Sequence, residues 1–183
     1  MKIYKAVKFN KKLPYDKIDN FLALFSEKPQ IISSENTLYA CVRYNPDTYL
    51  KNEQDIGKLY ESETISSLIM NNYRFLALLL KISREELVTF KNFSFYHDDS
   101  EEADIDKEEI ESQINQGSDL NFTFDVLEDK NQKIKYVELH LNNPKNMIRV
   151  YASGNIGLSN SFEPIYNEYI LKLVEFLFTG HNV

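Results

Sequence analysis

Apolar and polar residues alternate along three stretches of the final third of the chain, 120–126, 137–141 and 148–150. A repeat of two places alternate side chains on opposite faces of a β-strand. Turn-forming residues separate the stretches at 129–132 and 142–146. The pattern predicts a three-stranded antiparallel meander with one apolar face and one polar face.

A wide apolar face at helical spacing follows in residues 162–179, and Gly180 stands where a helix would end. Ser161 is the expected N-cap. So much apolar surface needs an apolar partner, and the meander supplies one. The sequence therefore predicts a long C-terminal helix packed against the sheet.

The first half of the chain mixes strand and helix patterns. Residues 2–9 interleave β-branched and aromatic residues with lysine, which is typical of a strand, and residues 38–44 alternate in the manner of a half-buried strand. Apolar residues recur at helical spacing in 16–25, with Asp16 as the expected N-cap. Residues 54–90 are expected to be mainly helical.

Two helices are expected within residues 54–90. Thr64 is the expected cap of the first, which carries Ile65 and Leu76 on its apolar face. Ser83 and Glu86 have the spacing of a capping box for a short second helix.

The chain has 183 residues, 43% of them hydrophobic, which is enough to bury a core. We expect one α+β domain over 1–183, with a mainly antiparallel sheet that includes the C-terminal three-stranded meander and packs against helices, including the long C-terminal helix. The alternative is a subdivision into a strand and helix part (1–90), an acidic connector (91–118) and the meander plus helix (119–183).

The N-terminal residues lack the pattern of a signal peptide, since lysines interrupt the apolar residues of 1–9. The longest apolar stretches fall well short of the roughly 20 residues that span a bilayer. The single cysteine, Cys41, suits a reducing compartment. We therefore expect a soluble cytoplasmic protein without membrane contact.

Negative charge is concentrated in one mid-chain segment. Residues 97–111 contain nine carboxylates and one lysine, a local charge of −8, whereas the whole chain carries −7. The remainder is therefore near balance, at +1. We call residues 98–111 the acidic segment, and its carboxylates are Asp98, Asp99, Glu101, Glu102, Asp104, Asp106, Glu108, Glu109 and Glu111.

The acidic segment has three interpretations. A run of like charges is most often a solvated surface. The same carboxylates can instead imitate a nucleic-acid backbone and occupy a channel lined by lysine and arginine. A calcium loop over 98–109 would place Glu109 at its twelfth position, but Ala103 stands at the sixth, where the turn needs glycine.

From the second interpretation we expect a protein-interaction module, an inhibitor of the type that phages and mobile elements carry. Its partner would be a protein with a basic surface, such as a nuclease or another nucleic-acid-binding protein. Direct nucleic-acid binding is not expected, because the basic residues are scattered rather than gathered into a stripe. The abundance of lysine, asparagine and isoleucine is typical of an AT-rich bacterial or phage genome.

A small enzyme is the alternative. Asp125, Glu138, His140 and Arg149 would share the polar face of the meander, and Arg149 would lie opposite either Glu138 or His140. No nucleophile or glycine-rich anion cradle accompanies them, and cross-strand ion pairs are common in sheets. Self-association as a structural subunit of a homo-oligomer is a further alternative.

No cofactor or metal is expected. His97, His140 and His181 lack the short spacings of zinc ligands, and Cys41 lies in a strand pattern typical of a core residue. A helix-turn-helix over 64–90 would offer only three basic residues to phosphates, namely Arg74, Lys81 and Arg84.

Overall fold

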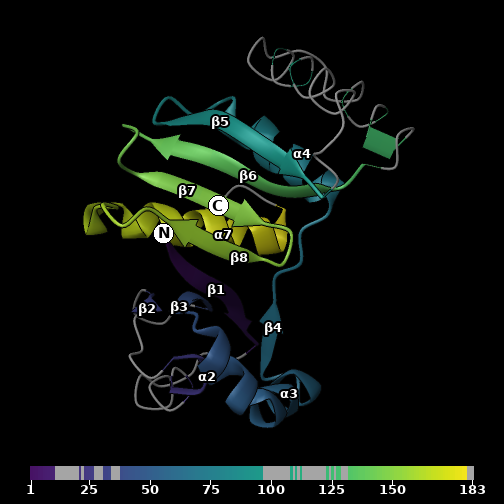
Figure 1. Cartoon of the computed structure of the whole chain (residues 1–183), viewed down its shortest axis with the longest axis vertical. Helices are drawn as coiled ribbons and strands as arrows, with labels where there is room; N and C mark the ends of the chain where they lie inside the picture. The colour runs from purple at the N-terminus through teal and green to yellow at the C-terminus, as the bar shows by residue number, and fades with distance from the viewer. Residues whose placement is uncertain are drawn as a thin grey trace. The chain divides into compact units, whose positions relative to one another are not determined.

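The computed structural model describes residues 1–10, 21, 23–26, 31–33, 38–96, 108, 110, 112, 123, 125, 127–128 and 132–180 (Figure 1). In these residues it combines helices with antiparallel strand pairs, so the chain is an α+β protein, as its sequence predicts. It forms two compact units, Met1–Leu68 with Gly154–Val183, and Ile69–Ser153. The expectation of one domain over 1–183 stays a prediction.

The sheet of the first unit is built around β1 (Lys2–Phe9). One edge of β1 pairs with β3 (Tyr39–Arg43), which pairs in turn with β2 (Ile31–Ile32). The other edge pairs with β8 (Asn155–Leu158) near the start of β1 and with β4 (Ile65–Ser67) near its end. The predicted strands at 2–9 and 38–44 are confirmed as β1 and β3.

Two short helices follow β3 in the first unit, α2 (Pro46–Lys51) and α3 (Glu53–Glu61), and Figure 1 shows them next to one another. Asn45 ends the strand pattern and caps α2, because its side-chain oxygen accepts a hydrogen bond from the Thr48 amide at 3.0 Å. Among the residues predicted as a helix over 16–25, Phe21 and 23–25 are helical, and Asp16 lies outside the described residues.

Both faces of β3 are buried, although its alternation predicts a half-buried strand. Ala40 and Val42 join an apolar cluster that includes Phe25 and Ile56. On the opposite face Tyr39 packs its ring 5.7 Å from the ring of Phe178, which belongs to the C-terminal helix α7 (Asn167–Thr179). Ala40, Cys41 and Val42 are small or apolar, so they can be buried on either face of the strand.

The predicted C-terminal helix is confirmed as α7, but it starts later than expected. It packs against β3 and β2, whereas the sequence predicts the meander as its partner. A 3₁₀ turn, η1 (Pro164–Tyr166), precedes it, so Ser161 is not its N-cap. Gly180 ends the helix in the left-handed conformation, at φ 71°, as its position predicts. Among the helices that the structure describes, none combines the length and apolar character needed to cross a membrane.

The second unit contains a three-stranded antiparallel sheet in the order β7-β6-β5. Its strands are β5 (Val88–Phe95), β6 (Ile134–Leu141) and β7 (Met147–Tyr151), which lie side by side in Figure 1. The helix α4 (Asn72–Ile82) contacts β5 and β6, and its buried side chains, Phe75 among them, face the sheet. The predicted strands at 137–141 and 148–150 are confirmed as β6 and β7.

The predicted strand at 120–126 is wrong where the structure describes it, because Thr123 and Asp125 are helical. The apolar residues Leu120, Phe124 and Leu127 are spaced by four and three, so the same stretch also satisfies a helical period. The first strand of the three-stranded sheet is instead β5, from a region that the sequence predicts to be helical.

The helical prediction for 54–90 fails at two places. Ile65 belongs to β4, which pairs with β1, so Thr64 does not cap a helix. The cap of α4 is Asn71, whose side-chain oxygen accepts a hydrogen bond from the Arg74 amide at 2.9 Å. The capping-box helix at Ser83 is replaced by β5, where a bulge between Phe90 and Asn92 interrupts the alternation that would have predicted a strand.

Candidate functional site

The acidic segment lies mostly outside the described residues. Eight of its carboxylates fall there: Asp98, Asp99, Glu101, Glu102, Asp104, Asp106, Glu109 and Glu111. Glu108 is described, is helical and is exposed, while Ile110 two positions later is buried. The role of the acidic segment in partner binding stays a prediction. The expectation that residues 98–109 form no calcium loop, because Ala103 replaces the glycine, also stays a prediction.

The polar face of the β5-β6-β7 sheet brings Glu138 and Arg149 together. The register of β6 and β7 places them directly opposite each other, and Arg149 Nε donates to Glu138 Oε2 at 2.6 Å. Of the two partners that the sequence allows for Arg149, the structure selects Glu138, and Met147 lies opposite His140. Glu138 is 8% exposed, so its carboxylate is largely desolvated, whereas the Arg149 side chain is 33% exposed.

Two tyrosines hold Arg149 in place. The guanidinium carbon lies 4.9 Å from the centre of the Tyr136 ring, and Tyr151 shares a hydrogen bond with the guanidinium. Desolvation is the largest influence on the pKa of Arg149 and lowers it. The hydrogen bonds to Glu138 and Tyr151 and the charge of Glu138 together outweigh desolvation and raise this pKa above its ordinary value.

His140 is the third member of the predicted group. Its Nε2 lies 3.7 Å from Glu138 Oε1, which is within ion-pair range but longer than a hydrogen bond. On β5, Asn92 lies opposite Glu138, and its side-chain oxygen is buried without a hydrogen-bond partner among the described residues. Asp125 does not belong to this face, because it is helical rather than part of a strand.

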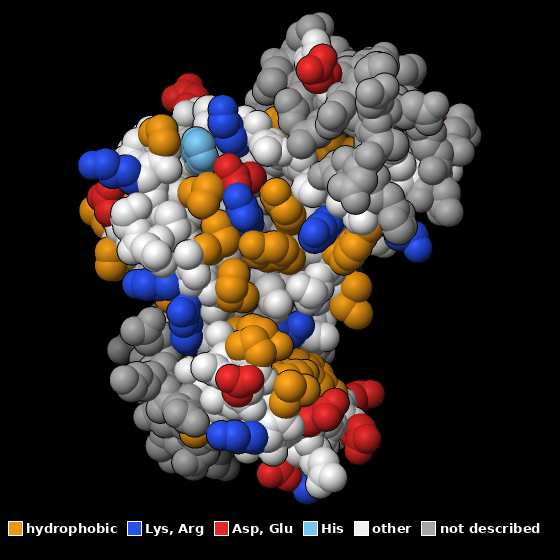
Figure 2. Space-filling view, in the orientation of Figure 1, with side chains coloured by type: hydrophobic (Ala, Val, Ile, Leu, Met, Phe, Trp, Pro, Cys, Tyr) orange, Lys and Arg blue, Asp and Glu red, His pale blue; other side chains and the backbone are white. Residues whose placement is uncertain are grey.

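Figure 2 shows histidine, acidic and basic side chains gathered over β5, β6 and β7, with hydrophobic side chains beside them. Glu138 is committed to Arg149 through one oxygen and approached by His140 at the other. Both carboxylate oxygens of Glu138 therefore lie within ion-pair distance of a neighbouring side chain. The described residues contain no group of three or more histidine, cysteine or carboxylate side chains that could hold a metal ion.

Cys41 is a core residue, as its strand pattern predicts. It is fully buried on β3, and burial raises the pKa of its thiol to about 12. The thiolate is the nucleophilic form of cysteine, so this side chain is not activated for attack.

The other sequence candidates for metal or nucleic-acid binding do not form a site in the described residues. His97 and His181 lie outside them. The strand β4 interrupts the stretch that would form a helix-turn-helix. Arg74 Nη1 donates to the Ile69 carbonyl at 2.9 Å, and Lys81 pairs with Glu85 at 2.7 Å, so both cations are engaged within the chain.

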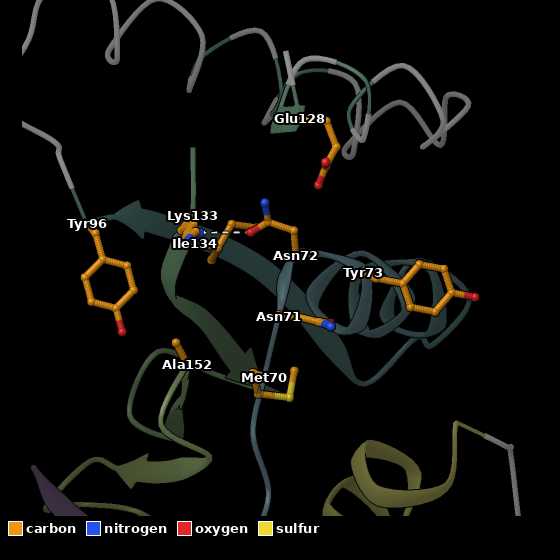
Figure 3. Close-up of a pocket in the computed structure, with 9 residues that line it drawn as sticks. All are labelled: Met70, Asn71, Asn72, Tyr73, Tyr96, Glu128, Lys133, Ile134 and Ala152. Carbon is orange, nitrogen blue, oxygen red and sulfur yellow. Dashed lines mark hydrogen bonds between the residues drawn. The ribbon is translucent and has the colours of Figure 1, made fainter. Parts of the chain in front are cut away.

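A pocket of about 680 Å³ lies within the second unit, where the start of α4 meets the end of β5 and the start of β6 (Figure 3). Nine residues line it: Met70, Asn71, Asn72, Tyr73, Tyr96, Glu128, Lys133, Ile134 and Ala152. The sequence does not predict this pocket. Its residues come from separate parts of the chain, and no motif joins them.

No protein-family model, curated protein sequence or solved structure matches this chain.

Proposed function

We propose that this protein is a protein-interaction module that binds a basic partner through the acidic segment. Its partner would be a nucleic-acid-handling protein, such as a nuclease, and binding would inhibit that protein by occupying its phosphate-binding channel. The observation that carries the proposal is the concentration of charge, with −8 in residues 97–111 and +1 in the rest of the chain. The same charge distribution makes direct binding to nucleic acid unfavourable.

Of the carboxylates of the acidic segment, Glu108 lies among the described residues and is exposed, whereas the neighbouring Ile110 is buried. We infer a cytoplasmic location, because nucleic-acid-handling proteins act there and the single cysteine suits a reducing compartment. An inhibitor carried by a phage or mobile element would have this location.

An interaction role is favoured over catalysis by the state of the reactive side chains. Glu138 is paired with Arg149 at 2.6 Å, and Cys41 is buried with a raised pKa. Glu138 is thus engaged in an ion pair, and the thiol of Cys41 is not activated as a nucleophile.

The experiment replaces Asp98, Asp99, Glu101 and Glu102 with their amides in one variant. Binding partners are captured from bacterial lysate at low salt, identified, purified and titrated with each variant at two salt concentrations. We expect the amide variant to lose most of its affinity, and the wild-type affinity to fall steeply with salt, because the contact is electrostatic.

The matched control removes the same number of charges from the first unit. Asp47, Glu53, Glu61 and Glu63 are all exposed, and their amides change the net charge by the same amount. This control should bind as the wild type does. Equal affinity for the acidic-segment variant, or equal loss in both variants, would remove the proposal.

A small enzyme centred on Glu138 and His140 is the second candidate. The 3.7 Å approach of His140 to the carboxylate is the observation that favours it. A screen of hydrolase and transferase substrates with the wild type and with His140→Ala tests it. Any activity that survives the substitution in full removes His140 from the reaction.

A further inference from the structure

A pocket of about 270 Å³ lies in the first unit, where η1 and the start of α7 meet the sheet around β1. Its lining combines residues of three strands with residues of the segment that leads into α7. The strands contribute Lys2, Tyr4, Ile32 and Leu158, and the segment contributes Phe162 and Asn167.

The strand register places the key side chains of this pocket on one face of the sheet. β1 lies between β3 and β8 (Figure 1). Lys2 and Tyr4 are two positions apart on β1, so both point to the same side. Leu158 of β8 lies directly opposite Lys2, and Arg43 of β3 lies directly opposite Tyr4. Directly opposite residues share a face, so Arg43 belongs to the same side as the pocket residues.

Arg43 brings a second positive charge to this face. Its guanidinium carbon lies 5.6 Å from the centre of the Tyr4 ring, and the two side chains share a hydrogen bond. Its Nη1 is nevertheless buried without a hydrogen-bond partner among the described residues. A buried charged donor without an acceptor costs free energy, so an acceptor is expected beside it. Because Tyr4 also lines the pocket, a negative charge bound there lies close enough to be attracted by this guanidinium.

The lining itself combines one cation with apolar surface. Of the described residues that line the pocket, Lys2 is the one with a charged side chain. Ile32, Leu158 and Phe162 supply apolar surface, and Asn167 supplies a polar side chain. The volume of about 270 Å³ is near the lower end of ligand pockets, roughly 300 Å³, so the pocket suits a small molecule.

We propose that this pocket binds a small carboxylate with an apolar body, such as an aromatic or a short branched-chain acid. The ammonium of Lys2 pairs with the carboxylate, and Arg43 adds to the attraction. The hydrocarbon part contacts the apolar lining and is removed from water. Both positive side chains disfavour a cation, and a bare inorganic anion leaves the apolar lining unused.

This site goes beyond the proposed partner binding by the acidic segment. The pocket argument uses residues of the first unit, none of which belongs to residues 98–111. The variant with amides at Asp98, Asp99, Glu101 and Glu102 should therefore bind the carboxylate as the wild type does. Failure of one proposal is thus distinguishable from failure of the other.

The test titrates the full-length protein with benzoate and follows backbone amide shifts by NMR. We expect saturable shifts at Ile32, Leu158 and Asn167, which line the pocket from three separate elements. Benzamide has nearly the same shape without the charge, and it should bind about tenfold more weakly. Inorganic phosphate should also bind more weakly than benzoate, because it has no apolar part.

Substitutions then separate the pocket from the net charge of the protein. Lys2→Met should weaken benzoate binding about tenfold, and Lys2→Arg should keep most of the affinity. Arg43→Met should weaken binding about threefold, because its charge acts at a longer distance. Lys8→Met is the matched control, since Lys8 lies on the same face of β1 but outside the lining, and it should bind as the wild type does.

The amide spectrum of each variant also reports whether its fold is kept. The proposal is overturned if the benzoate shifts do not saturate, or if benzamide or phosphate binds as well as benzoate. It is equally overturned if Lys2→Met or Arg43→Met binds benzoate as the wild type does. An equal loss in Lys8→Met would also overturn it, because the effect would then follow the net charge rather than the pocket.

Discussion

The strands β3 and β6 both alternate in sequence, yet they differ in how they are buried. β3 is covered on both faces, by the cluster around Val42 on one side and by α7 on the other. β6 buries Val137 and Leu139 on the face toward α4 and presents Tyr136 and His140 on its other face, where both are only partly buried.

The difference teaches where chemistry can reside in this chain. In β3 even the polarisable Cys41 is sealed from water, so it contributes packing alone. The polar face of β6 and β7 holds an ion pair, a partly buried histidine and two tyrosines whose rings are tilted to each other. A strand with one uncovered face can therefore carry function, and a strand covered on both faces serves the core.

Leu139→Ala tests the covered face of β6 and should have the largest effect. Leu139 is fully buried, so the substitution should lower the free energy of unfolding by about 2–5 kcal/mol. The neighbouring His140→Ala, on the other face, should cost about 1 kcal/mol or less. Urea denaturation measures both, and equal losses would contradict the one-sided burial of β6.

Alkaline pH tests the sealed state of Cys41 in β3. Below the ordinary thiol pKa of 9.0 the folded and unfolded chains both hold the proton, so the stability contribution is complete. Between pH 9 and about 12 the unfolded chain loses the proton while the folded chain keeps it. The free energy of unfolding should then fall by about 1.4 kcal/mol for each pH unit.

Cys41→Ala lacks this thiol, so its free energy of unfolding should fall less steeply with pH in the alkaline range. The comparison of the two slopes cancels the titration of other groups. A thiol reagent adds a second readout, because the chain has a single cysteine. Rapid labelling of the native protein at neutral pH would show that β3 is open to solvent on one face.

Glu138→Ala sharpens the comparison on the polar face of β6. It leaves the guanidinium of Arg149 without its anion, so the free energy of unfolding should fall by about 1–3 kcal/mol. A double-mutant cycle with Arg149→Ala should give a clear coupling energy. The matched control is the exposed pair of Asp55 and Lys58 on α3, whose coupling should be close to zero. Similar coupling in both pairs would mean that the polar face is as solvated as an ordinary surface.

Tyr96→Ala should have the smallest effect on stability. Its ring is more than half exposed, so the free energy of unfolding should change by no more than about 0.5 kcal/mol. Thermal denaturation measures this change. A large loss would assign Tyr96 to the core of the second unit rather than to a binding surface.

Several elements could be predicted from the sequence because their pattern is local. β6, β7 and α7 each carry an uninterrupted period, β1 combines lysine with β-branched and aromatic residues, and Gly180 marks the end of α7. β5 could not be predicted, because its bulge shifts the apolar residues out of alternation. The stretch with Thr123 and Asp125 fits both the two-residue period of a strand and the period of a helix, so its sequence alone does not decide between them. In the structure these residues are helical, and Leu127 of the same stretch is buried.

For the candidate sites, the sequence identified Glu138, His140 and Arg149 as neighbours on one face, and it left the partner of Arg149 open. The register of β6 and β7 decided in favour of Glu138. The pocket beside Asn72 was not predictable, because its walls meet only when α4 docks on the start of β6.

The sequence by itself determined the periodic elements, the α+β class and the position of the acidic segment, since each depends on residues close together in the chain. The tertiary structure decided which strands pair, that β3 is covered twice, and that Tyr73 of α4 and Tyr96, directly after β5, line one pocket. These features depend on contacts between residues far apart in sequence, and their energy comes from packing and desolvation summed over the whole core. A short sequence pattern therefore does not predict these long-range contacts.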